Sequence, residues 1–235
     1  MLISVHLPKT AGSSFLKSLE DHFGDRLYRD YRDFPLNVSR PRRRGWAIVG
    51  NFLNIGGSLH AIECIHGHFL PAKYFLLSMR RPTRFVTWMR HPVERLASHY
   101  KFWRESYDSA ASQPLHRRVV EEDWSFERFS LSPSLRNVYG QFLWCFPLSR
   151  FSFVGITEHY EEDLSLFADS VLGTTLQPYS IRTHADRQTP GYGIADDLRQ
   201  AIETFHRDDM MLYREALRLR HERTRRAPVR SRAPA

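Results

Sequence analysis

Short apolar runs and helical stretches alternate along this chain. The apolar runs, at 3–7, 61–65, 85–89 and 150–156, are typical of strands buried on both faces of a sheet. Apolar residues three and four positions apart predict helices at 13–23, 71–77, 92–100, 124–129, 160–172, 195–205 and 208–220. A weaker signal predicts a strand at 46–50, and 25–44 reads as a surface loop. This alternation predicts an α/β fold: a largely parallel sheet flanked by helices in three layers.

Length and composition fit one sizeable domain. The chain has 235 residues, of which 42% are hydrophobic. No apolar run reaches the ~18 residues of a membrane span, and no signal peptide precedes the first strand, so a cytoplasmic protein without a membrane span is expected. We expect the domain to cover 1–217, followed by a tail at 218–235 that is a frayed helix and then disordered.

The positive charge is concentrated in that tail. The net charge is +8, and seven arginines against Glu222 give 218–235 a charge of +6, which leaves +2 for the rest. Nucleic acid is therefore not an expected partner. The two cysteines, Cys64 and Cys145, are far apart and outside metal-ligand spacing, so we expect two buried free thiols and no metal.

The first predicted strand leads into a corner suited to an anion. Pro8 ends the strand, Gly12 allows a close backbone approach, and Ser13 and Ser14 open a helix. A strand, a tight turn and a helix direct free N–H groups and the positive end of the helix dipole at a ligand. Lys9 adds a full charge, and Thr10 adds a hydroxyl to those of the serines. An ordinary β-α corner is the plainer alternative.

A second group of polar residues follows the strand at 61–65. His66 and His68 flank Gly67, which predicts a bend that lets both imidazoles leave the strand ladder. Histidine is suited to removing a proton from a hydroxyl near neutral pH. A histidine pair in a polar turn, or a metal site, are the alternatives.

A third corner follows the strand at 85–89. Arg90 lies at the strand end, where its guanidinium can bind a phosphate through two N–H groups, and Pro92 suits the first turn of the next helix. Ser98, about two turns into that helix, can add a hydroxyl donor. Surface arginines at a plain strand-to-helix corner are the alternative.

These motifs together resemble sulfotransferases that use 3′-phosphoadenosine 5′-phosphosulfate (PAPS). Pro-Lys-Thr-Ala-Gly-Ser-Ser at 8–14 is similar to their phosphosulfate loop. It differs from a nucleotide-kinase loop, in which the lysine follows the glycines, because Lys9 precedes Gly12. His-Gly-His-Phe at 66–69 resembles the base site of uronyl 2-O-sulfotransferases and bacterial relatives. The segment 90–100, which also contains Arg95 and Tyr100, is similar to the 3′-phosphate element. Weaker likenesses lie at 153–158, which includes Glu158, and at 209–213. The carbohydrate branch is the most similar in detail.

The resemblance implies a P-loop-like fold and roles for individual residues. The residues expected to bind PAPS are Lys9, Thr10, Ala11, Gly12, Ser13, Ser14, Arg90 and Ser98. Lys9 would act in catalysis, with His68 as the first choice for the base and His66 as the second. A loop at 177–193 with Arg182, His184 and Arg187 would close over the nucleotide.

The implied reaction moves a sulfuryl group from PAPS to an acceptor hydroxyl on a carbohydrate, releasing adenosine 3′,5′-bisphosphate, without a metal. Two alternatives stay open. A P-loop kinase would need a Mg²⁺-binding acid at the end of an apolar strand. A basic anion-binding module without catalysis would work through the arginine tail and the arginines at 40–44.

Overall fold

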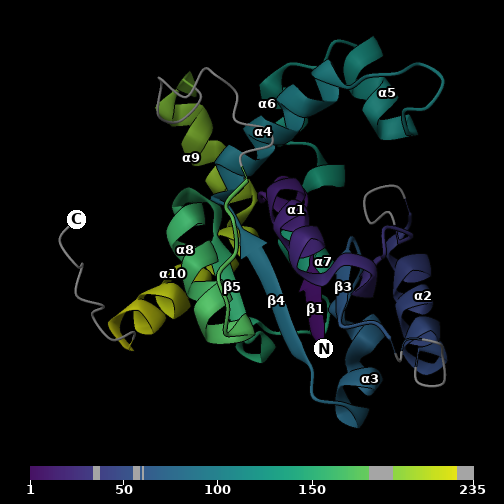
Figure 1. The fold of residues 1–235 in the computed structure, drawn as a ribbon. Helices are drawn as coiled ribbons and strands as arrows, with labels where there is room; N and C mark the ends of the chain where they lie inside the picture. Colours follow the sequence, from purple (N-terminus) through teal and green to yellow (C-terminus); the bar gives the residue numbers. More distant parts are fainter. Residues whose placement is uncertain (34–37, 55–58, 60, 180–192, 227–235) are drawn as a thin grey trace.

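The centre of the molecule is a parallel sheet. The computed structural model describes residues 1–33, 38–54, 59, 61–179 and 193–226. In this part of the chain five strands pair in the order β2-β3-β1-β4-β5, every neighbour parallel (Figure 1). The strands are β1 (Leu2–Val5), β2 (Leu27–Arg29), β3 (Cys64–Gly67), β4 (Arg84–Met89) and β5 (Phe153–Ile156). The connection that leaves β1 leads toward β2 and the one that leaves β4 leads toward β5, so the chain leaves these two neighbouring strands in opposite directions across the sheet.

Helices cover both faces of the sheet. They are α1 (Gly12–Phe23), α2 (Arg40–Leu53), α3 (Phe75–Arg80), α4 (Pro92–Glu105), α5 (Pro114–Glu121), α6 (Phe126–Ser130), α7 (Val138–Phe142), α8 (Tyr160–Phe167), α9 (Asp196–Phe205) and α10 (Arg207–Arg226). A short 3₁₀ turn, η2 (Pro71–Tyr74), leads into α3. Among the described residues, none of the helices combines the length and the apolar character that crossing a bilayer requires.

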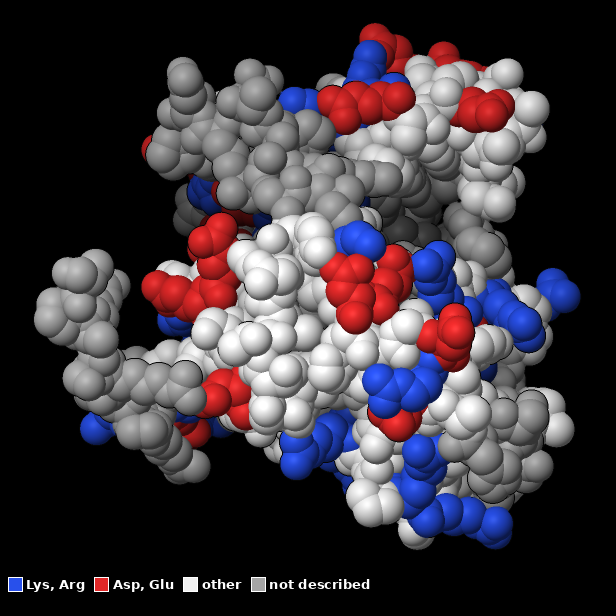
Figure 2. Space-filling view, in the orientation of Figure 1, with Lys and Arg blue, Asp and Glu red and all other residues white. Residues whose placement is uncertain are grey.

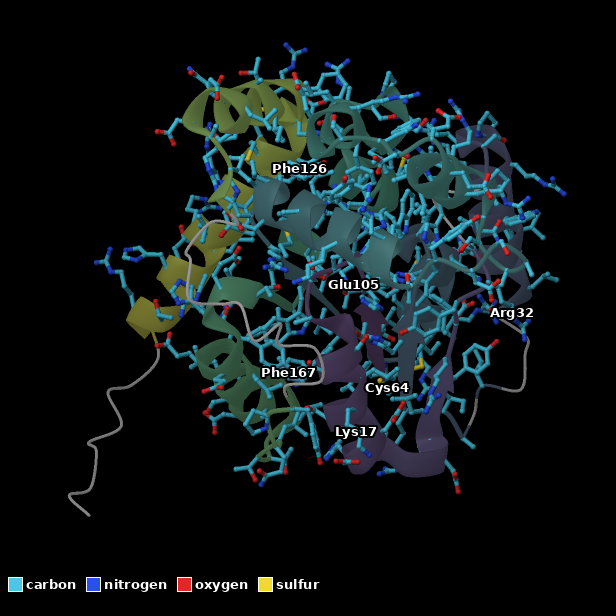
Figure 3. The ribbon with its side chains drawn as sticks, turned by 90° about the horizontal axis from the view of Figure 1, so that it is seen from above. Lys17, Arg32, Cys64, Glu105, Phe126 and Phe167 are labelled. Atoms are coloured by element: carbon cyan, nitrogen blue, oxygen red, sulfur yellow. The ribbon has the colours of Figure 1, made fainter. Side chains whose placement is uncertain are left out.

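Two apolar cores lie on the two faces of the sheet. On one face, α1 and α8 pack on the strands through residues such as Phe15 and Phe167, whose rings are 5.1 Å apart. Figure 3 shows Phe167 and Cys64 close to α1 on this side. On the other face, α7 and α10 contribute Tyr139 and Tyr213. The predicted three-layer α/β fold with a parallel sheet is confirmed.

The interpretation of 25–50 from sequence is wrong. The predicted surface loop contains the edge strand β2, and the predicted strand at 46–50 lies inside the helix α2. The helix was missed because its buried side carries Arg43 and Ala47, whereas its apolar residues face outward. The usual inward apolar stripe is therefore absent from this part of the pattern.

The helix α10 extends into the predicted tail. The expected boundary between 217 and 218 falls within α10, which continues to Arg226. Arg220 from this last part donates to Asp163 of α8 at 2.9 Å, and the Asp163 carboxylate is fully buried. Residues 227–235 lie outside the described residues. Of the two thiols, Cys64 is buried as expected, but Cys145 is exposed.

Candidate functional site

The three predicted groups of polar residues meet at one edge of the sheet. The strands β3, β1 and β4 are adjacent and parallel, and their register aligns Val5 with Gly67 on one side and with Thr87 on the other. His68, Lys9 and Arg90 follow these strands within a few residues. The carboxyl ends of the strands, where the arrows of Figure 1 end, therefore bring the three segments together. In open α/β folds, ligands usually bind at this edge, where the connections from two neighbouring strands run in opposite directions, as they do from β1 and β4.

The loop between β1 and α1 has an unusual backbone. Lys9 and Ala11 adopt positive φ angles of 65° and 63°, a left-handed conformation that costs about 1 kcal/mol or more for each such residue. The Thr10 hydroxyl donates to the carbonyl of Leu7 at 2.8 Å and closes the turn. Strain of this kind persists only where surrounding structure fixes it, and it turns successive N–H groups toward one concave side.

The first turn of α1 is suited to an anion. Its first intrahelical bond runs from Phe15 N–H to the Ala11 carbonyl at 3.0 Å, and no side chain caps the helix. The N–H groups of Gly12, Ser13 and Ser14 come before that bond, at the positive end of the helix dipole. Ser13 is exposed and Ser14 is half-buried. The three predicted hydroxyl donors therefore differ in their surroundings. The Thr10 hydroxyl already donates within the loop, whereas the side chains of Ser13 and Ser14 are at least partly exposed.

Lys9 is held between the loop and α4. Its Nζ lies 4.1 Å from the ring centroid of Phe102, a cation-π contact. The contact places the ammonium beside α4, the helix that follows β4.

His66 does not leave the strand ladder, so the predicted bend at Gly67 is wrong. His66 pairs with Ser4 of β1 and with Arg29 of β2, and it is 1% exposed. Gly67 is needed for another reason: a Cβ there would lie 1.7 Å from the carbonyl oxygen of Asp30. The glycine allows β2 to continue closely past β3.

The two predicted base candidates have different surroundings. His66 Nδ1 shares a hydrogen bond of 2.8 Å with the Ser4 hydroxyl, and burial lowers its pKa to about 3. His68 is half-buried, and its Nδ1 lies 2.6 Å from the carbonyl oxygen of His6. A carbonyl can only accept, so His68 Nδ1 is the donor and Nε2 carries the lone pair in the neutral ring. Burial lowers the pKa of His68, and the bond to His6 partly offsets this.

His6 belongs to the same cluster, although sequence reasoning gave it no role. Its ring stacks on His68 with centroids 4.2 Å apart and on His66 at 5.1 Å, and its Nδ1 lies 3.2 Å from the Tyr31 hydroxyl. A Cβ on Gly12 would lie 1.8 Å from His6 Nε2. Its position in the sequence could have indicated this, because His6 comes one residue after β1 as His68 comes one residue after β3. The pairing of Val5 with Gly67, continued by one residue, places His6 opposite His68.

Other side chains hold the backbone of the Arg90 corner in place. The Tyr139 hydroxyl accepts from Arg90 N–H at 3.0 Å and donates to the Arg90 carbonyl at 2.5 Å. Glu158 accepts from His91 N–H at 2.7 Å, where α4 begins. The Glu158 side chain thus holds the backbone at the start of α4, next to Arg90. This contact fits the sequence interpretation of Glu158 as an acid at a helix N-terminus.

The remaining residues of the third motif turn inward. Ser98 is 5% exposed on α4, and Arg95 is fully buried. Arg95 lies 5.7 Å from the centroid of the Tyr139 ring, and burial lowers its pKa while nearby Asp209 raises it. Tyr100 donates to the Trp124 carbonyl at 2.7 Å, which makes it a packing residue. Arg90 is therefore the arginine of the motif with access to solvent.

Two further points complete the site. No group of three or more His, Cys, Asp or Glu side chains suited to a metal ion occurs within the described ranges. Arg182, His184 and Arg187 of the predicted closing loop lie outside the described residues.

Comparisons with known proteins give similarity in structure and no match in sequence. No protein-family model matches the chain, and no curated protein has a matching sequence. Among solved structures, a sulfotransferase from Alicyclobacillus acidocaldarius is similar at 14% sequence identity and a TM-score of 0.44, with 90% of this chain and 92% of that chain covered.

Proposed function

We propose that this chain is a PAPS-dependent sulfotransferase that acts on an acceptor hydroxyl. The observation that carries the proposal is the shared location of Lys9, His68 and Arg90, just past three adjacent parallel strands. Two anion-binding corners beside one oriented imidazole suit a nucleotide with phosphates at both ends. The motif His-Gly-His-Phe favours a carbohydrate as the acceptor.

The two corners would bind opposite ends of the donor. The N–H groups at 12–14 and the ammonium of Lys9 would hold the 5′-phosphosulfate, because a helix N-terminus and a lysine both favour negative charge. Arg90 and Ser98 would hold the 3′-phosphate. Tyr139 supports this assignment because it fixes the backbone of Arg90 on both its N–H and its carbonyl.

The reaction would be a direct transfer. The acceptor oxygen forms a bond to sulfur while the bond from sulfur to the 5′-phosphate oxygen breaks, and adenosine 3′,5′-bisphosphate leaves with that electron pair. His68 Nε2 accepts the hydroxyl proton. The lowered pKa of His68 keeps this nitrogen unprotonated at neutral pH. Lys9 stabilises the charge that grows on the leaving oxygen.

His66 is the second candidate for the base. Its burial and its bond to Ser4 favour His68 for direct contact with an acceptor. The variants His68→Ala and His66→Ala separate the two, and His68→Ala is expected to lose more turnover. Equal, full activity in both variants would remove the histidine base from the mechanism.

Lys9→Ala tests the proposal directly. Loss of a preorganised donor to a developing charge lowers turnover by about 10²–10³. Lys17→Ala is the matched control, since Lys17 lies on α1, the helix that follows the loop of Lys9, and pairs with Asp21 at the surface. The measurement is transfer of radiolabelled sulfate from PAPS to a panel of carbohydrate, lipid and phenolic hydroxyls. No transfer to any of them, with no binding of adenosine 3′,5′-bisphosphate, would refute the proposal.

The two alternatives fit the structure less well. A kinase needs a Mg²⁺-binding acid at a strand end. Asp30 directly follows β2, but Lys73 Nζ and the Tyr74 hydroxyl bind it at 2.6 and 2.7 Å. Stronger binding of ATP with Mg²⁺ than of adenosine 3′,5′-bisphosphate would nevertheless favour the kinase. A basic module would use the arginines at 40–44 and those of the tail, of which Arg220 is bound to Asp163.

A further inference from the structure

The outer face of α2 is apolar where a surface helix is normally polar. Arg43 and Ala47 are buried against the protein. Five of the eight large hydrophobic side chains that are exposed in the described chain lie on this one helix. They are Trp46, Ile48, Val49, Phe52 and Leu53, with exposed fractions from 40% to 69%. Single exposed apolar residues are common, but a contiguous group marks an interaction surface.

These five side chains form one continuous face. Trp46, Val49 and Leu53 are three and four residues apart, and Ile48 and Phe52 form the adjoining row. A sixth apolar side chain, Met79 of α3, is 70% exposed on a helix that packs beside α2. We call this group, together with the arginines described next, the α2 face.

The charge around the apolar residues has one sign. Arg40, Arg42 and Arg44 are exposed in the first part of α2, and Arg80 is exposed on α3. The segments α2, η2 and α3 contain no Asp or Glu. The guanidinium of Arg42 lies 5.2 Å from the ring centroid of Trp46, next to the apolar rows. Figure 2 shows lysine and arginine side chains gathered at the lower right, where Figure 1 draws α3.

This combination indicates what covers the face. Tryptophan, phenylalanine and leucine on one side of a helix, with arginines beside them, are typical of helices that lie in the plane of a membrane interface. The 14 residues of α2 span about 21 Å, too short to cross a bilayer core of about 30 Å. A second copy of the chain would bring two sets of arginines together, which like-charge repulsion opposes.

We propose that the α2 face binds the surface of an anionic lipid bilayer. The apolar side chains enter the boundary between headgroups and acyl chains, and the arginines contact the negative headgroups. This inference is independent of the proposed reaction.

Vesicle binding by the full chain tests it. Two vesicle types are compared by flotation: phosphatidylcholine alone, and phosphatidylcholine mixed with phosphatidylglycerol. We expect binding to the mixed vesicles that weakens as salt increases, and much weaker binding to phosphatidylcholine alone. Phe52→Gln is expected to lower the partition coefficient by about tenfold. Arg42→Glu is expected to lower it by about fivefold or more.

The control is Met211→Gln, since Met211 is 58% exposed but lies on α10. It should bind as the unaltered chain does. All three side chains are exposed, so each variant should unfold at the unaltered urea midpoint. Three results would overturn the proposal: no binding to the mixed vesicles, unchanged binding by Phe52→Gln, or self-association that Phe52→Gln abolishes without any vesicle binding.

Discussion

Replacing Gly12 by alanine tests the contact between the start of α1 and the cluster of His6, His66 and His68. The φ angle of Gly12 is not in the positive range, so alanine fits its backbone. In an open site this change would stabilise the protein by about 0.4–1 kcal/mol, because alanine restricts the unfolded chain. At Gly12, however, the new Cβ would lie 1.8 Å from Nε2, 2.0 Å from Cδ2 and 2.3 Å from Cε1 of His6.

The imidazole of His6 has little room to move. It is stacked on the His68 ring and hydrogen-bonded to the Tyr31 hydroxyl. Overpacking of this kind costs about 1–3 kcal/mol, which exceeds the gain from alanine. We therefore expect Gly12→Ala to destabilise the protein by about 1–2 kcal/mol. In a His6→Ala background the obstacle is gone, so the same change should become stabilising by about 0.5–1 kcal/mol.

The unaltered protein, Gly12→Ala, His6→Ala and the double variant form a double-mutant cycle. Equilibrium unfolding of these four proteins in urea gives the coupling energy between Gly12→Ala and His6→Ala. The expected value is about 1–3 kcal/mol, provided that the slopes of the transitions agree. An equal effect of Gly12→Ala in both backgrounds would refute the close approach of His6 to the loop.

Three other predictions follow from buried polar groups. Burial lowers the pKa of His66 to about 3 and of His206 to about 4. In the unfolded chain the pKa of a histidine is near 6.5, so below this pH the unfolded chain binds protons that the folded protein does not. The unfolding free energy should therefore fall by about 2 kcal/mol for each histidine between about pH 7 and pH 5. Urea midpoints that stay constant over this range would contradict the prediction. Tyr139→Phe removes both hydrogen bonds between the Tyr139 hydroxyl and the Arg90 backbone, so it should lower the unfolding free energy by about 1–3 kcal/mol and weaken binding of adenosine 3′,5′-bisphosphate. An unchanged affinity in calorimetric titration would show that Tyr139 does not support the site. Asp163→Ala leaves an arginine of α10 without its buried carboxylate and should cost about 3–5 kcal/mol in thermal or urea denaturation, whereas a change under about 1 kcal/mol would show that the pair is dispensable.

The sheet and the location of the site could be predicted from sequence because their signals are local. Apolar runs mark β1, β3, β4 and β5, and each polar group follows its strand directly. Parallel strands then bring the groups to one edge without further information.

The internal details of the site could not be predicted, because they depend on contacts distant in sequence. His68 obtains its orientation from the carbonyl of His6, 62 residues away. The roles of Gly67 and His66 depend on β2, a three-residue strand with too short a pattern to recognise. The helix α2 was missed because its apolar side faces outward.

The bond between Asp163 and Arg220 also has a consequence for how the protein is made. Asp163 accepts from the backbone of β5 at Ile156 as well as from Arg220, so it joins the last strand to the last helix. While a ribosome is still adding the residues of α10, this carboxylate has no arginine partner. The edge of the sheet at β5 therefore gains this support only after the chain has been synthesised as far as Arg220, whereas the residues of β1 to β4 are made much earlier.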